Sequence, residues 1–228
     1  CKGASPLVKT IDFGLIPKKG RVESLYYLTK KGADIVKNQF QVEAIKFPLG
    51  RTVSFTSDYF HRVATIECEV SLYLSSQTKN ILFSHRYFDQ KGSNRSGDLC
   101  LDTKIVSYDT TIISDWVFML ETKKQAELYC AEIYMDDHDA SRPFFSLRSY
   151  LHIISEGAPS IKYHFNRSNR VLAVFGTERT MFSVLKKIQS DPEFQNFSNH
   201  FLFKSLENIS SDFHEDWIHI DGRVGRMW

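Results

Sequence analysis

The sequence lacks the patterns that mark several large classes of enzyme. It has no Gly-rich phosphate-binding loop, no Gly-x-Ser-x-Gly elbow and no internal repeat. ATPases need the first pattern to cradle phosphates, and many serine hydrolases need the second to expose a nucleophile. We therefore do not expect an ATPase or a serine hydrolase.

Cysteines and long apolar runs are also scarce. Cys1, Cys68, Cys100 and Cys130 have neither Cys-x-x-Cys nor Cys/His zinc spacing, and three of them lie in apolar segments where free thiols usually pack. No apolar run approaches the roughly 18 residues of a transmembrane helix, and the N-terminus does not read as a signal peptide. We expect a cytoplasmic protein without membrane insertion in a reducing compartment.

Excess charge of one sign is the third absence. The 29 basic and 27 acidic residues give a net charge of +2, so binding to nucleic acid must be argued from where the basic residues lie. The 228 residues, 42% of them hydrophobic, suit one domain plus a small module. Pro48 and Gly50 interrupt the apolar periodicity of the chain. We therefore place the domains at residues 1–46 and 47–228.

Residues 1–46 are typical of the end of a winged-helix module. An apolar helix end at 13–16, a basic turn, a strand at 25–28 and a helix opened by Thr29 follow one another. A complete module needs two or three helices before them, so we expect the chain to begin inside the module.

Three basic residues, Lys18, Lys19 and Arg21, would sit at the tip of this wing. There they can reach DNA phosphates. The alternative is an ordinary solvated turn.

The segment from Ser114 to Met135 predicts a β-hairpin. Apolar strands at 115–120 and 128–135 flank a polar connection, and a turn centred near residue 123 or 124 places Asp115 opposite Glu132. Like charges in opposed positions are destabilising, so the pair requires a cation or a proton, and a divalent metal is the natural candidate. The alternative is that Asp115 is a turn residue and Glu132 an edge-strand acid.

The helix expected after Ser57 or Asp58 carries two further polar residues of interest. Its apolar stripe, Phe60, Val63, Ile66 (or Glu67), Val70 and Tyr73 or Leu74, predicts the buried face, and a neighbouring stripe consists of His61, Thr65, Cys68 and Leu72. His61 lies beside that face, where a lone histidine is more often a hydrogen-bonded core residue than a ligand. Glu67 is by default a solvated acid.

The other expected elements define the fold class. They are strands at 80–85, 103–108 and 171–176, a polar loop at 88–99, and helices at 144–154 and 178–190. A buried strand followed by a crossover helix is typical of parallel α/β structure. We expect an α/β (α+β) fold with a mixed central sheet flanked by helices, and assign no chemistry to the tail after Asp191.

Five segments in this order resemble the replication-relaxation family, which includes MobC-type plasmid mobilisation relaxases. They are YYLTKKGAD, HRVATIECEVSLYL, SDWVFML with AEIYMDD, SLRSYLHII and VLAVFGTERTMFSVL, and they span about Val22 to Ser190. The resemblance implies a winged helix fused to a restriction-endonuclease-like core. In such a core, an Asp at the start of one strand and a Glu on the next bind a divalent metal.

By this match, Asp115 and Glu132 would hold Mg²⁺ or Mn²⁺, with His61 and Glu67 beside them. The implied activity is metal-dependent nicking of one DNA strand at a plasmid transfer origin. The implied partners are that DNA and accessory mobilisation or coupling proteins.

The sequence departs from the family pattern at two points. The Lys usual two residues after the Glu is replaced by Tyr134, and no Pro precedes Asp115. A cation can migrate to the following helix, where Arg148 and Arg142 are available. Tyr134 is itself a possible nucleophile, and Tyr150 a more distant one.

The competing hypothesis is a non-catalytic winged-helix replication initiator or regulator with a degenerate nuclease-like domain. Loss of the Lys favours it. Retention of both Asp115 and Glu132 favours the nuclease, because an idle site has no reason to keep a repulsive pair.

Overall fold

The computed structural model divides the chain into two compact units, Cys1–Thr56 and Ser57–Trp228. It describes residues 6–12, 14–16, 20–41, 59–75, 80–88, 92–93, 99–100, 102–121, 125–135, 139–167, 169–209 and 212–227. The expected domain boundary, between residues 46 and 47, lies outside these residues.

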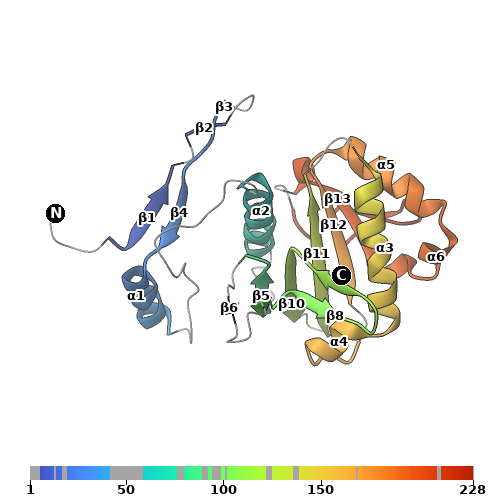
Figure 1. Cartoon of the computed structure of the whole chain (residues 1–228), viewed down its shortest axis with the longest axis horizontal. Helices are drawn as coiled ribbons and strands as arrows, with labels where there is room; N and C mark the ends of the chain where they lie inside the picture. Colours follow the sequence, from blue (N-terminus) through green and yellow to red (C-terminus); the bar gives the residue numbers. More distant parts are fainter. Residues whose placement is uncertain are drawn as a thin grey trace. The chain divides into compact units, whose positions relative to one another are not determined.

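The first unit contains a ribbon of paired strands (Figure 1). β1 (Val8–Ile11) pairs antiparallel with β4 (Leu25–Leu28), and β2 (Leu15–Ile16) pairs antiparallel with β3 (Gly20–Arg21). The strand expected at 25–28 is confirmed. The helix end expected at 13–16 is wrong for Leu15 and Ile16, because a short apolar run does not by itself distinguish a helix from a strand whose partner follows a turn.

Helix α1 (Lys30–Phe40) follows the ribbon, and its first turn explains why Gly32 stands three residues after Thr29. The Thr29 side chain accepts a hydrogen bond from Gly32 N at 3.2 Å, as expected of an N-cap. Thr29 Oγ1 also donates to Pro6 O at 2.7 Å. A Cβ at position 32 would overlap Leu7 O, so only glycine lets the helix lie this close to the chain before β1.

The second unit is built on a seven-stranded mixed sheet (Figure 1), which confirms the mixed α/β class. In spatial order its strands are β15 (Val224–Gly225), β14 (Trp217–His219), β13 (Phe201–Ser205), β12 (Arg170–Phe175), β11 (Ala126–Tyr134), β10 (Trp116–Glu121) and β5 (Asn80–Arg86). β10 is antiparallel to both of its neighbours, whereas β11, β12 and β13 are parallel. The tail, to which the sequence assigned no chemistry, supplies three of these strands.

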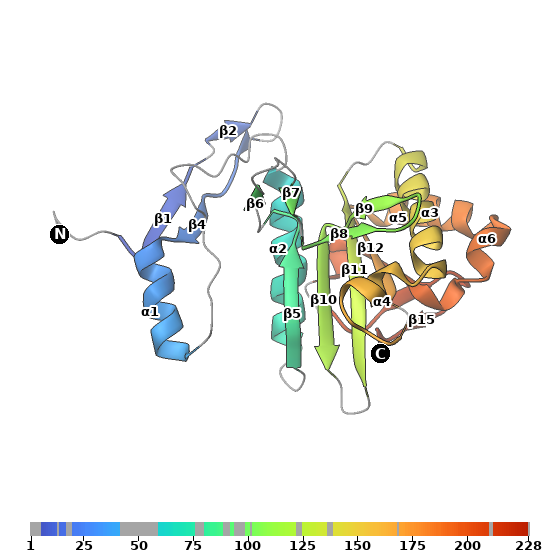
Figure 2. The ribbon, with the colours of Figure 1, turned by 60° about the horizontal axis from the view of Figure 1, so that its bottom comes forward.

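Helices cover both faces of this sheet (Figure 2). α2 (Tyr59–Ser75) lies on one face, and α3 (Ser141–Ser155) and α5 (Glu178–Gln189) lie on the other. Side chains of β10 alternate between the two layers, with Trp116 and Phe118 packed on the α2 side and Val117 and Met119 on the α3 side. The two buried clusters therefore meet across the central hairpin.

The buried face of α2 differs from the one that the apolar stripe indicates. Ala64, Cys68 and Leu72 are buried, whereas Val70 and Tyr73 are 49% and 51% exposed. Small side chains let the helix approach the aromatic residues of β10 and β11 closely, and this packing decides its rotation. The stripe expected to be buried is therefore wrong, and the neighbouring stripe with Thr65, Cys68 and Leu72 is the buried one.

Short elements complete the described part of the chain. They are β6 (Gly92–Ser93), β7 (Leu99–Cys100), β8 (Lys104–Val106), β9 (Thr111–Ile113), α4 (Ala158–Lys162), α6 (Pro192–Gln195), η1 (Ser198–His200) and η2 (Leu206–Asn208). Within the residues described, no helix has both the length and the apolar character needed to cross a bilayer.

Candidate active site

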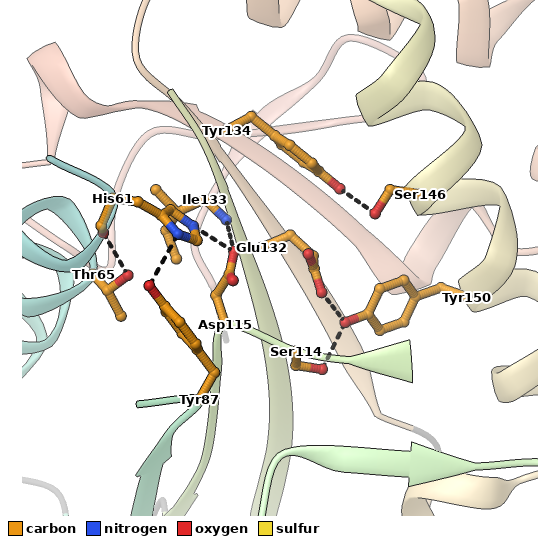
Figure 3. A network of polar contacts seen from close by, with 10 residues as sticks. All are labelled: His61, Thr65, Tyr87, Ser114, Asp115, Glu132, Ile133, Tyr134, Ser146 and Tyr150. Atoms are coloured by element: carbon orange, nitrogen blue, oxygen red, sulfur yellow. Dashed lines mark hydrogen bonds and ion pairs between the residues drawn. The ribbon is translucent and has the colours of Figure 1, made fainter. Parts of the chain in front are cut away.

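The register of the β10–β11 hairpin is the one that the sequence predicts. Trp116 pairs with Ala131 and Val117 with Cys130, so one step further Asp115 lies opposite Glu132. The two carboxylates thus lie at the open end of the hairpin, and Asp115 immediately precedes β10. What the register did not predict is that hydrogen bonds join them to helices on opposite faces of the sheet (Figure 3).

The Asp115 carboxylate is held from two directions. Its Oδ2 accepts a hydrogen bond from the backbone N–H of Ile133 at 2.7 Å and lies 3.0 Å from Nε2 of His61. The backbone donor belongs to the partner strand, and His61 comes from the first turn of α2. The side chains of Asp115 and His61 are 14% and 28% exposed, so this pair is accessible only in part.

His61 is oriented on its other side by Tyr87. Nδ1 lies 3.2 Å from the Tyr87 hydroxyl, and the two rings stack with centroids 5.3 Å apart. A carboxylate only accepts hydrogen bonds, so Nε2 carries a proton towards Asp115. In neutral imidazole Nδ1 is then an acceptor, and the Tyr87 hydroxyl donates to it.

Glu132 belongs to a closed network on the α3 side. Its Oε1 accepts a hydrogen bond from the hydroxyl of Tyr150, and that hydroxyl lies 2.6 Å from Ser114 Oγ. Burial, and after it the charge of Asp115, raises the pKa of Glu132 well above its ordinary value. A proton on Glu132 is therefore one way in which the opposed acids coexist.

Tyr134, a nucleophile suggested by the sequence, has surroundings that do not suit that role. Its hydroxyl donates to Ser146 Oγ at 3.0 Å, and burial raises its pKa well above the ordinary tyrosine value. The pKa of Tyr150 is raised in the same direction, again chiefly by burial. Both hydroxyls are thus poor sources of phenolate.

Arg148 and Glu67 are not brought to the carboxylates. The Arg148 guanidinium pairs with Glu193 at 2.6 Å and with Asp191 at 3.4 Å, both at α6. Glu67 is exposed, and the six residues that separate it from His61 turn it about 240° around α2. The geometry therefore does not support Glu67 beside the two acids or Arg148 as the cation that replaces the Lys.

The basic residues of the wing are described only in part. Lys18 and Lys19 lie outside the described residues. Arg21 is at the end of β3, its side chain is 79% exposed, and its Nη2 lies 3.9 Å from Oδ2 of Asp12.

Tyr87 is the residue of this site that the sequence analysis missed. β5 pairs with β10 so that Arg86 lies opposite Trp116, and Tyr87 therefore lies opposite Asp115. Its backbone N–H donates to Asp115 O at 2.9 Å. No local pattern indicates this position. The register of β5 on β10 cannot be predicted from a short turn, because a long segment separates the two strands.

The oxygen atoms of Asp115 and Glu132 fit a hard divalent cation. Mg²⁺ typically uses one or two carboxylates and completes its shell with water and substrate oxygen, and Mn²⁺ prefers similar ligands. Across the described ranges, no group of three or more His, Cys, Asp and Glu side chains is placed to hold a metal. A metal held here would have this carboxylate pair as its protein ligands among the described residues.

Comparisons of the chain with models of protein families, with curated proteins and with solved structures find no match.

Proposed function

We propose that this chain is a metal-dependent DNA endonuclease of the relaxase type, which nicks one strand at a plasmid transfer origin to start mobilisation. The observation that carries the proposal is the position of Asp115, just before β10, opposite Glu132 in β11. The resemblance noted in the sequence requires an Asp at the start of one strand and a Glu on the next. A restriction-endonuclease-like core with a winged-helix remnant is part of the same proposal.

The chain's own residues would hold and prepare the site. Mg²⁺ or Mn²⁺, bound by Asp115 and Glu132, would polarise a phosphoryl oxygen and stabilise the charge that develops on it. The Ile133 N–H and His61 fix the Asp115 carboxylate in place. Glu132 has to give up its proton to become a ligand, so binding of the metal should release protons.

The proposal is tested by strand nicking and by stability together. Supercoiled plasmids with random-sequence inserts are the substrate, and the melting temperature is measured with and without Mn²⁺. Metal at about a hundredfold its dissociation constant should stabilise the protein by roughly 2.7 kcal/mol. Asp115→Asn and Glu132→Gln should each abolish both effects.

Glu121→Gln is the matched control, since Glu121 is an exposed acid at the other end of β10. It should nick DNA and bind metal as the wild type does. Metal-dependent nicking that survives in Asp115→Asn or Glu132→Gln would contradict the proposal.

The wing residues Lys18, Lys19 and Arg21 would contribute DNA affinity through phosphates. Replacing all three with Ala should flatten the log–log dependence of the binding constant on salt by about 0.9 for each phosphate that the protein no longer neutralises. Lys186→Ala, an exposed change in the second unit, should leave that slope unchanged. An unchanged slope in the triple variant would remove the wing from the DNA interface.

The second candidate function is a non-catalytic DNA-binding replication initiator or regulator. It is favoured by Tyr134 in place of the usual Lys and by the pairing of Arg148, one of the two candidate cations, with Asp191 and Glu193. Binding of DNA without any metal-dependent nicking would support this function over the first.

A further inference from the structure

Two adjoining hollows lie at the end of the central hairpin that is opposite to the two acids. The larger, about 650 Å³, is lined by residues of β5, β10 and the start of β11 and by residues 163–167. The smaller, about 220 Å³, continues to the start of β12. Both are lined by Gln125, Ala126, Phe165 and Arg167, so together they form one groove, which we call the hairpin groove.

The hairpin groove is separate from the candidate active site. Ala126 begins β11, and Glu132 stands six residues further along the same strand. A strand rises about 3.3 Å per residue, so roughly 20 Å separates the groove from the acids.

Aromatic rings form much of the wall of the groove. Phe83 and Tyr163 stack with centroids 5.4 Å apart, and Phe83 also stacks on His85. Phe165 is only partly buried and lines both hollows. A flat aromatic group of a ligand can therefore pack against Phe165.

Positive charge lies at the open surface of the groove, and negative charge is enclosed. Arg167 is exposed, and its guanidinium donates to the neutral side-chain oxygen of Gln125. Gln125 in turn donates to Glu127 Oε1 at 2.6 Å. Glu127 is the acid that lines the groove, but it is only 8% exposed, and Arg170 Nε lies 3.9 Å from its Oε2. The groove therefore suits an anion on the side of Arg167.

Neutral polar side chains add hydrogen-bonding groups to the groove. Asn166 lines the larger hollow and Asn199 the smaller, and an amide can bond both a phosphate and the edge of a base. Glu121, an exposed acid opposite Ala126, accepts a hydrogen bond from Asn80 and does not line either hollow.

We propose that the hairpin groove binds an unpaired segment of a DNA strand, with a base on Phe165 and phosphates at Arg167 and Arg170. This inference rests on the proposed function and names a second place at which its substrate is held. A basic groove with an aromatic platform is the arrangement that binds single strands, because unpaired bases expose the faces that a duplex hides. A stacked strand advances about 3.4 Å per nucleotide, so the segment would lie roughly six nucleotides from the acids.

The test uses the full chain and a labelled oligothymidylate of about a dozen nucleotides, with a chelator present so that no strand is cut. Fluorescence anisotropy gives the dissociation constant at several salt concentrations. The single strand should bind more tightly than a duplex of the same length. Phe165→Leu should weaken binding on the order of tenfold, the usual effect of losing one stacked base. Arg167→Ala should flatten the log–log salt dependence by about 0.7, the value for one phosphate of a single strand.

The matched controls are Phe182→Leu and Arg179→Ala, both in α5. Phe182 is 50% exposed and Arg179 is exposed, and neither lines the groove. Both variants should bind the strand as the wild type does. Melting temperatures of all four variants separate loss of binding from loss of folding.

Photocrosslinking gives a second measurement that needs no variant. A strand with 5-iodouracil in place of thymine is irradiated on the wild-type protein, and peptide mass spectrometry locates the bond. The crosslink should lie on Phe165 or Tyr163. A crosslink confined to other segments would overturn the inference.

Three further results would overturn it. They are wild-type affinity in both Phe165→Leu and Arg167→Ala, equal affinity for duplex and single strand, and displacement of the strand by free thymidine monophosphate at the same nucleotide concentration. The last would mean that the groove is a site for free nucleotides.

Failure of this inference is distinguishable from failure of the proposed function. Asp115→Asn should bind the strand in the groove as the wild type does, because the acids lie at the other end of the hairpin. Binding in the groove without any metal-dependent nicking would reject the proposed function alone. Nicking by a protein that does not bind the strand in the groove would reject the inference alone.

Discussion

The two acids at the open end of the β10–β11 hairpin face each other but have different surroundings. Asp115 is joined to the α2 side of the sheet, where His61 and Tyr87 continue its hydrogen bonds. Glu132 is joined to the α3 side, where Tyr150 and Ser114 close the network within the protein.

Strand pairing treats Asp115 and Glu132 alike, but their hydrogen-bond partners make the two carboxyl groups chemically different. Strand register makes Asp115 and Glu132 neighbours, but the helix over each face determines their partners. Two N–H donors serve the Asp115 carboxylate, whereas burial favours the neutral form of Glu132. The α2 side therefore gives Asp115 polar partners that are partly exposed, whereas the α3 side encloses Glu132 in a buried network.

The largest effect on stability is expected from Tyr150→Phe. The change leaves the buried Ser114 and Glu132 without a shared hydroxyl partner, and an unsatisfied buried polar group costs about 1–3 kcal/mol. Tyr87→Phe, its counterpart on the α2 side, should cost less than about 1 kcal/mol because its hydroxyl is only partly buried. Urea denaturation of both variants measures the two losses in free energy of unfolding. Equal losses would mean that the two hydroxyls contribute equally to stability.

A pH dependence of stability is expected from Glu132. Its pKa is raised in the folded protein above the ordinary 4.5, so the folded state holds an extra proton between that value and the folded pKa. Stability of the metal-free protein should therefore fall as pH rises through this window, by at most about 1.4 kcal/mol per pH unit.

Glu132→Gln should remove this contribution to the slope, because the amide does not titrate and still accepts the hydrogen bond from Tyr150. Denaturation with a chelator present, at several pH values, measures both slopes. An unchanged slope in Glu132→Gln would mean that Glu132 is ionised in the folded protein.

Asp115→Asn should destabilise the metal-free protein by about 1 kcal/mol, the net contribution of a typical hydrogen bond. One amide oxygen replaces two carboxylate oxygens, so the donors from Ile133 and His61 compete for a weaker acceptor. Thermal and urea denaturation provide the measurement. A clear gain in stability would instead mean that repulsion by Glu132 dominates at Asp115.

The smallest loss should follow His61→Ala, at or below about 1 kcal/mol, because the side chain is 28% exposed and water can replace its hydrogen bonds. A loss of several kcal/mol would indicate that His61 is a core residue and that the two sides of the sheet are equally structural. The melting temperature is the measurement.

Several features of the site could be predicted because their signals are local. Two apolar strands around a polar connection placed Asp115 opposite Glu132, since the register of a hairpin follows from its turn. Thr29 was identified as the start of α1 because an N-cap needs only its own side chain and the next turn.

Other features depend on contacts between distant segments. The rotation of α2 follows from small residues such as Ala64 and Cys68 meeting aromatic residues of the sheet, and the apolar stripe of the helix alone indicated a different face. Tyr87 reaches the site only because β5 pairs with β10 across a segment of nearly thirty residues.

By itself, the sequence determined the mixed α/β class, the central hairpin and the opposition of its two acids. These depend on periodicity and turn length, which act over a few residues. Only the tertiary structure decided that Asp115 joins His61 and Tyr87 while Glu132 joins Tyr150. Those partners come from α2, β5 and α3, and their positions are set by how the helices pack on the two faces of the sheet.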